Sequence, residues 1–210
     1  MRRITEKADG FPLDNFIDVR EGLKRIRLEG THLEEDELFD LKRSLQTIIA
    51  LTDYINRGDE DDEGNITYDY PALHDLADGV ATFPRIVQRI EQVIDKFGRM
   101  RDTASPELNR IRRELASTEG SISRTLYSIL KSAQSDGIVE KDVTPAVRDG
   151  RLVIPVAPGL KRRISGIVHD ESATGKTVYI EPTQVVEANN RIRELESDER
   201  REIVRILTEI

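Results

Sequence analysis

The chain has 210 residues, of which 34% are charged and 5% are aromatic, and it contains neither Trp nor Cys. This composition suits helices with exposed polar faces better than a thick globular core, and it excludes disulfides, thiol nucleophiles and Cys-based zinc sites. The net charge of −8 argues against a chain wrapped along its whole length by nucleic acid, so any phosphate contact has to be local.

No apolar run reaches the roughly 18–20 residues that cross a bilayer, and we expect a soluble, cytoplasmic protein. Helical patterns dominate the first half of the chain, where apolar residues recur at three- and four-residue spacing. The helices predicted there span residues 15–28, 34–56, 71–78 and 84–96. The acidic stretch 58–65 is predicted to be a solvated turn or loop, with a metal site as the alternative, and residues 97–104 are predicted to form a turn or brief hairpin.

A long helix is predicted to begin after Ser105, which is suited to cap it, and to continue to about Gln134. Short β-type runs follow, and turn pairs such as Asp149-Gly150 separate them. We therefore expect three or four antiparallel strands within residues 142–182, with Pro145, Pro155 and Pro158 at edge positions.

The last predicted helix begins near Thr183 and continues to the end of the sequence at Ile210. Its middle, Glu196–Glu202, is charged on every side, so we expect this part to bridge space between two packed ends. Because no capping residue precedes the last position, we expect the sequence to be a fragment of a longer protein, cut within a helix.

Two motifs suggest catalytic sites but have simpler interpretations. Ala173–Thr177 (ATGKT) resembles part of a phosphate loop, but it lacks the earlier glycine and a strand follows it, so we expect a hairpin turn. His169, Asp170 and Glu171 resemble a metal-ligand cluster, but no second His lies at a suitable spacing. Ser172 has no general base near it in sequence. We therefore predict no catalytic, cofactor-binding or metal-binding residue in this chain.

The distribution of charge is more informative than these motifs. Residues 141–182 contain seven Lys or Arg against five Asp or Glu, so the rest of this acidic chain carries a net charge of −10. Cations at hairpin ends can reach a phosphate backbone, although the same residues can simply keep a loop soluble. The predicted DNA- or RNA-binding residues are Arg148, Arg151, Lys161, Arg162, Arg163 and Lys176.

The chain resembles the MutS family, and within it the branch of the bacterial second MutS, which is linked to recombination control rather than mismatch reading. The resemblance is strong from residue 102 onward and rests on three segments. These are Asp102–Leu115 (DTASPELNRIRREL), Val147–Val156 (VRDGRLVIPV), and a motif formed by His169, Asp170, Ser172, Thr174, Gly175, Thr177, Glu181 and Pro182. Residues 13–100 agree with the family only in helical rhythm.

The resemblance implies a fold that is mainly α with a small antiparallel β subdomain: a helical core, two long lever helices and a β clamp at the tip. The implied division is a helical core over 11–104, an ascending lever over 105–140, the clamp over 141–182 and a returning lever over 183–210. Proteins of this family are homodimers that enclose DNA, and a C-terminal ATPase closes the ring. This chain lacks the ATPase motifs, the nuclease domain found in many members of the branch and the mismatch-reading domain.

The predicted function is that of a non-catalytic part of a DNA repair and recombination-control ATPase, which binds the backbone of duplex or branched DNA as part of a dimeric clamp. The chain itself is predicted to be no enzyme and to need no cofactor. The full-length protein is expected to be an ATPase that uses ATP and Mg, and members of this branch often carry a C-terminal nuclease domain as well. Two alternatives stay open: a clamp that binds ribosomes or rRNA, and an enzyme that uses the His169–Glu171 cluster with a metal.

Overall fold

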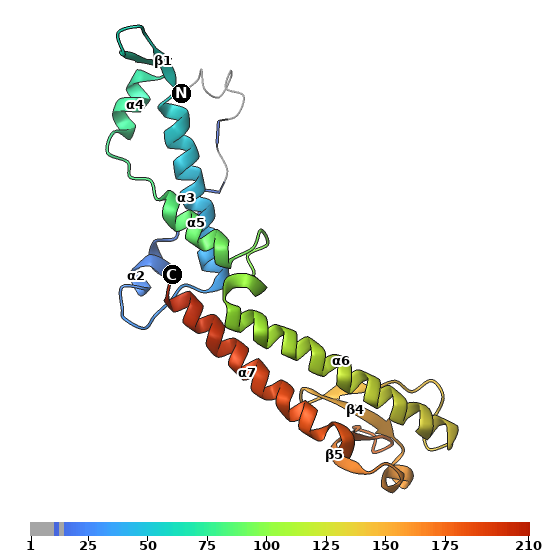
Figure 1. Cartoon of the computed structure of the whole chain (residues 1–210). Helices are drawn as coiled ribbons and strands as arrows, with labels where there is room; N and C mark the ends of the chain where they lie inside the picture. The colour runs from blue at the N-terminus through green and yellow to red at the C-terminus, as the bar shows by residue number, and fades with distance from the viewer. Residues whose placement is uncertain (1–10, 13–14) are drawn as a thin grey trace. The chain divides into compact units, whose positions relative to one another are not determined.

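The computed structural model describes residues 11–12 and 15–210, which divide into two compact units (Figure 1). One unit comprises the chain up to Ser105 together with Ile203–Ile210, and the other is Pro106–Glu202. Helices predominate, with two small antiparallel sheets, so the predicted fold class is confirmed. The four-part division into core, levers and clamp stays a prediction. Among the described residues, no helix is long and apolar enough to cross a membrane.

The helices of the first unit match their predicted positions, apart from the first. The predicted 34–56 helix is α3 (Glu35–Ile55), which begins with a capping box between Glu34 and Glu37. The helix predicted over 15–28 is reduced to α2 (Arg20–Arg25). Asn15 has a left-handed backbone, with φ of 61°, which prevents a helix from starting there.

The acidic stretch of the first unit forms a β-hairpin rather than a loop. Its strands are β1 (Gly58–Glu60) and β2 (Ile66–Tyr68). Two shorter helices follow, α4 (Pro71–Ala77) and α5 (Pro84–Val93), each with proline in its first turn. A turn and the short 3-10 helix η1 (Asp102–Ala104) occupy the predicted break before the next helix.

Two long helices frame the second unit, α6 (Pro106–Ser135) and α7, whose full extent is Val186–Thr208. Ion pairs join them: Arg112 Nε lies 2.7 Å from Glu199 Oε1, and Arg191 Nη2 lies 2.7 Å from Glu114 Oε1. Glu202 is buried. The expectation that the charged segment of α7 crosses open space is therefore wrong at Glu199, whose carboxylate pairs with Arg112 of α6, and at Glu202, which is buried.

A four-stranded antiparallel sheet in the order β3-β4-β6-β5 lies between these helices in the sequence. The strands and the 3-10 helices beside them are β3 (Ala146–Arg148), β4 (Arg151–Val156), η2 (Pro158–Arg163), β5 (Gly166–Glu171), β6 (Val178–Pro182) and η3 (Thr183–Val185). The predicted hairpin turn is confirmed, since Asp149 and Gly150 both have positive φ. Pro155 lies in an inner strand, but β3 pairs only with Arg151–Val153, so Pro155 has one neighbouring strand.

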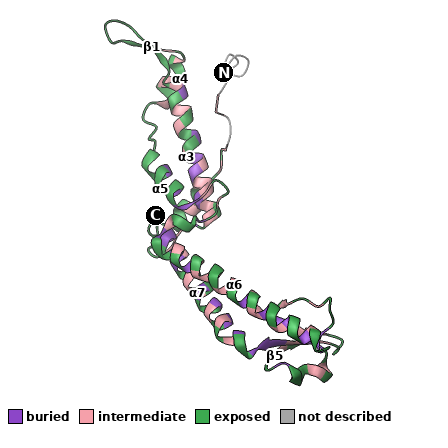
Figure 2. Ribbon diagram, turned by 45° about the vertical axis from the view of Figure 1, so that its right-hand side comes forward, coloured by how far each residue is buried: buried purple, intermediate pink, exposed green. Residues whose placement is uncertain are grey.

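One apolar core joins α6, the sheet and the start of α7. Figure 2 shows buried residues on the inner side of α6 and in the sheet. The core side chains include Ile122, Leu126, Leu130, Ile154, Ile180, Val185 and Ile192. Burial of this apolar surface fixes the sheet on the last turns of α6 and thereby gives the loops around it a defined position.

Candidate nucleic-acid interface

Three adjacent cations, Lys161, Arg162 and Arg163, lie on η2, the connection between β4 and β5. We call them the η2 basic segment. All three are exposed, and no described residue gives their side chains a hydrogen-bond or ion-pair partner. Because a 3-10 helix has three residues per turn, consecutive side chains point in three directions around it. Their charges are therefore available to an anion over a wide range of approach.

The backbone that carries the η2 basic segment is anchored on both sides. Leu160 packs against the apolar core before the cations, and Ile164 is buried within that core after them. The amide of Leu160 donates to the carbonyl oxygen of Ala157 at 2.9 Å, which closes the turn. The segment is thus an exposed group of charges on an ordered backbone.

Arg151 has a different environment, because its guanidinium is directed into the protein. Its side chain is 13% exposed, and Nη1 lies 2.7 Å from Glu181 Oε1. Nη2 donates to Asn190 Oδ1 at 2.6 Å, so the side chain connects β4 with both β6 and α7. Arg151, predicted to bind DNA or RNA, therefore lies in an internal ion pair with Glu181.

Glu181 is fully buried, and polar groups from three other elements meet at its carboxylate. Oε1 also accepts a hydrogen bond from Asn189 Nδ2 of α7 at 2.7 Å, and Oε2 is bonded to His169 Nε2 of β5. We call Glu181, Arg151, His169 and Asn189 the Glu181 network. Burial by itself raises the pKa of Glu181, but the hydrogen bonds from Asn189, His169 and Arg151 outweigh it and lower the pKa below its usual value.

The position of His169 follows from an irregularity in the sheet. The β5–β6 register shifts between Val168 and Asp170, so His169 lies at a bulge. A bulge can redirect a side chain, and here the imidazole reaches the carboxylate of Glu181 on the next strand. Two residues of the motif that carries the family resemblance are thereby explained as partners within the fold.

The environment of Arg148 is intermediate between that of the exposed η2 basic segment and that of the internally paired Arg151. Its Nε lies 3.2 Å from Asp170 Oδ2, and the guanidinium lies over the ring of Tyr179 at 3.9 Å from the ring centre. Its side chain is 36% exposed, and that of Asp170 is 46% exposed. Part of its charge is therefore accessible from solvent.

Lys176 lies on the turn between β5 and β6, and it is exposed without a partner among the described residues. The turn is the predicted hairpin turn: Gly175 has φ of 65°, its amide donates to Ser172 O at 2.8 Å, and Ser172 Oγ accepts from the Thr177 amide at 3.0 Å. A strand follows rather than a helix. These residues do not fit the phosphate loop of an ATP site.

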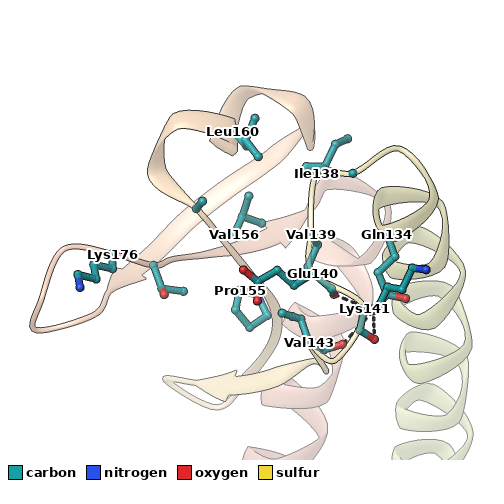
Figure 3. A pocket seen from close by; sticks show the side chains of 13 residues that line it. Gln134, Ile138, Val139, Glu140, Lys141, Val143, Pro155, Val156, Leu160 and Lys176 are labelled. Atoms are coloured by element: carbon teal, nitrogen blue, oxygen red, sulfur yellow. Dashed lines mark hydrogen bonds between the residues drawn. The ribbon is translucent and has the colours of Figure 1, made fainter.

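A cavity of about 540 Å³ adjoins this turn, lined by Lys176, Lys141 and apolar side chains such as Val139, Val156 and Leu160 (Figure 3). Gln134 at the end of α6 fixes its wall by donating to the carbonyl oxygens of Glu140, Lys141 and Val143 at 3.1–3.2 Å. Both lysines belong to the rim of an otherwise mainly apolar hollow.

The cluster of His169, Asp170 and Glu171 is separated by the fold. His169 is directed to Glu181, whereas Asp170 pairs with Arg148. Within residues 11–12 and 15–210, no group of three or more His, Asp or Glu is arranged to hold a metal ion.

Sequence reasoning missed the Glu181 network and with it Asn189. One signal was present: His169 and Glu181 fall on consecutive strands of a hairpin, so a register assignment would have brought them close. The contribution of Asn189 carries no local signal, because it comes from the packing of α7 on the sheet.

No protein-family model matches the chain. Among curated proteins, it is 37% identical over 199 residues to the Endonuclease MutS2 of Geobacillus sp. (strain WCH70), with 95% of this chain and 24% of that protein aligned. It is 38% identical over 199 residues to the Endonuclease MutS2 of Ruminiclostridium cellulolyticum, with the same coverage. It is 35% identical over 208 residues to that of Enterococcus faecalis, with 99% of this chain and 25% of that protein aligned. The chain thus spans about a quarter of the length of the curated relatives it matches.

Proposed function

The chain belongs to the MutS family, in the branch of the bacterial second paralogue, and from this premise we propose that it is a non-catalytic, DNA-contacting part of a MutS-type protein. It binds the sugar-phosphate backbone of duplex or branched DNA rather than base edges. Contacts of this kind fix position on DNA without reading sequence.

The observation that carries this proposal is the η2 basic segment. Lys161, Arg162 and Arg163 are exposed and have no partner among the described residues, on a backbone that Leu160 and Ile164 anchor. Because the backbone of the segment is already ordered, binding costs it little backbone freedom, and the cations displace counterions from the phosphates. Lys176 belongs to the same proposed surface, and Arg148 contributes in part.

Arg151 is left out of the proposed contact surface, because Glu181 and Asn190 already bind its guanidinium. Releasing it toward a phosphate would leave a buried carboxylate without its main counter-charge, which is energetically unfavourable. The proposed surface is therefore smaller than the sequence predicts.

In the complete protein, α6 and α7 would act as the levers of this DNA contact. We propose that ATP and Mg bind outside this chain and that the resulting rearrangement reaches the sheet through these helices, as a coupling free energy between two sites. Two copies in a homodimer would enclose the DNA, and simultaneous engagement would raise the affinity above that of one copy.

The test is charge reversal of Arg162 and Arg163 to Glu in the complete protein. Binding of a labelled duplex and of a branched DNA is measured between about 50 and 200 mM salt. We expect weaker binding of both, and a salt slope reduced by about 2, because each phosphate contact contributes roughly 1. The matched control is reversal of Arg201 and Arg205 on α7, which pair with Asp198 and Glu209, and little change is expected.

Unchanged affinity and salt slope in the Arg162 and Arg163 variant would remove the basis of the proposed surface. A parallel experiment with ribosomes distinguishes the alternative partner from DNA. If the wild-type protein co-sediments with ribosomes at salt concentrations that abolish DNA binding, and the variant does not, the partner is the ribosome and the DNA proposal is wrong.

A further inference from the structure

The outer face of α6 carries cations without carboxylates. Positions at alternating four- and three-residue intervals lie on one side of a helix, opposite the buried stripe that includes Ile122 and Leu126. We call these positions the α6 outer face, and they are Arg113, Ser117, Gly120, Arg124, Tyr127 and Lys131.

The three cations of this face are exposed and unpaired. No described residue provides a hydrogen-bond or ion-pair partner for the side chains of Arg113, Arg124 or Lys131. No Asp or Glu occupies the face itself. Beside it, the exposed Arg110 is paired with Glu107 and Glu114, and the exposed Glu119 lies farther round the helix. Figure 2 shows this exposed side along α6.

The exposed surface of α7 provides the comparison for an ordinary solvated helix. Arg191 pairs with Glu114 and Glu194, and Arg201 pairs with Asp198. Solvated helices usually intersperse the two signs of charge in this way, because i,i+3 and i,i+4 pairs stabilise them slightly. A face with cations alone forgoes that stabilisation, so solubility does not account for it.

Two further residues suit contact with a large ligand. Gly120 lies within α6 at a cost of about 1 kcal/mol relative to Ala, yet a side chain there would meet nothing within 4 Å. Tyr127 is 58% exposed, which places an aromatic ring and a hydroxyl donor in solvent. Internal packing explains neither residue.

The face is long enough to lie beside several phosphates of a nucleic-acid backbone. From Arg113 to Lys131 it extends about 27 Å at 1.5 Å per residue. Each strand of a duplex carries one phosphate per about 3.4 Å of axis, so the face spans roughly eight phosphates. Three fixed cations and a hydroxyl can contact several of them along one side.

We infer that the α6 outer face is a second backbone-contact surface for duplex DNA, in addition to the η2 basic segment. It rests on the proposed function, since it extends the DNA contact of the same unit from the sheet along the helix. The occupant is a polyanion with regularly spaced phosphates, and the small side chains Ser117 and Gly120 let its backbone approach the helix closely.

The test replaces Arg113, Arg124 and Lys131 together by Gln in the complete protein. Binding is measured with the same labelled duplex as for the charge reversal of Arg162 and Arg163, which we call the η2 variant. We expect the salt slope to fall by about 3, one for each phosphate contact, and the affinity to fall most at low salt. The matched control replaces Arg200, Arg201 and Arg205 of α7 by Gln, which removes the same charge from positions next to carboxylates.

A second variant tests the face without changing its charge. Gly120→Leu replaces the weakest helix former in the interior of α6 by a strong one, so the helix is stabilised, but it places a branched side chain in the middle of the face. We expect weaker binding of the duplex with an unchanged salt slope, and a melting temperature at least as high as that of the wild type.

The outcomes separate this inference from the proposed function. If the η2 variant loses binding while the triple α6 variant and Gly120→Leu bind as the wild type, the α6 outer face makes no contact and this inference is wrong. If neither η2 nor α6 variants change binding, both are wrong. If the α6 variants lose binding to ribosomes and not to the duplex, the surface recognises ribosomes and the DNA assignment is overturned.

Discussion

Arg151 and the η2 basic segment lie close in the sequence but in opposite environments. Arg151 is 13% exposed and bound to the buried carboxylate of Glu181, whereas Lys161, Arg162 and Arg163 are exposed on η2. Both groups belong to the same small sheet and its connections. The difference lies in what the fold places next to each guanidinium.

The comparison teaches that formal charge overstates the charge available to a partner. Residues 141–182 have a balance of +2, but Arg151 and Glu181 neutralise each other internally, and Asp170 takes part of the charge of Arg148. The available cations are instead concentrated on η2 and at Lys176. α6 has the same balance of +2, with five Lys or Arg against three Asp or Glu, but one of its faces presents cations alone.

The largest expected effect on stability is seen when a buried and an exposed arginine are each replaced by Met. Arg151→Met leaves Glu181 buried without its main counter-charge, and we expect the free energy of unfolding to fall by about 3 kcal/mol. Arg162→Met changes an exposed residue, so the expected loss is within about 0.5 kcal/mol. Urea unfolding followed by circular dichroism measures both.

DNA binding should show the opposite order at a temperature where both variants are folded. Arg162→Met weakens binding and lowers the salt slope by about 1, whereas Arg151→Met leaves the slope of the folded protein unchanged. If Arg151→Met is as stable as the wild type and lowers the slope, the two arginines have equivalent roles and the comparison fails.

The pKa of Glu181 gives a pH test of the same network. Its pKa is lowered in the folded protein, so its contribution to stability is fully present above the pKa of the unfolded chain, about 4.3, and is lost as the pH falls through the folded value. The free energy of unfolding is compared for the wild type and Glu181→Gln from neutral pH downward. We expect the wild type to be more stable at neutral pH and the gap to narrow on acidification.

A matched control for this pH series is Glu171→Gln, an exposed carboxylate on β5. Its profile should follow that of the wild type, because other carboxylates with lowered pKa, such as Asp61 and Asp95, are present in both. A gap between wild type and Glu181→Gln that widens at low pH would contradict a lowered pKa of Glu181.

Local patterns predicted the helices and strands well because each is specified by neighbouring residues. Apolar spacing predicted α3 and α6, and Asp149-Gly150 predicted the β3–β4 turn. The long helix expected at 15–28 failed, because a periodic pattern does not show that the backbone of Asn15 is left-handed. The β1–β2 hairpin was missed because its acidic residues are poor strand formers, and hydrogen bonds to Asp61 stabilise its turn.

The candidate site was predicted less completely, because availability of charge depends on tertiary contacts. The sequence identified Lys161, Arg162 and Arg163 as adjacent cations, but it could not show that Arg151 faces Glu181. That pairing needs the β4–β6 register and the packing of α7, which supplies Asn189 and Asn190. The α6 outer face was overlooked since its cations are distant in sequence and alternate with apolar residues that attract attention first.

Arg148 gives the smallest expected effects, because its environment lies between that of the paired Arg151 and that of the exposed Arg162. Its ion pair with Asp170 joins two partly exposed side chains, which limits the stabilisation to about 0.5 kcal/mol, and the contact with Tyr179 adds a similar amount. We expect Arg148→Gln to lower the free energy of unfolding by no more than about 1 kcal/mol, and the salt slope by less than the change in Arg162→Met.

A double-mutant cycle with Asp170→Asn isolates the ion pair between Arg148 and Asp170. Asp170→Asn alone should strengthen DNA binding, because it releases Arg148 toward the phosphates. If Asp170→Asn weakens binding instead, Asp170 holds Arg148 in the orientation that the DNA requires, and a paired cation would then be part of the contact surface.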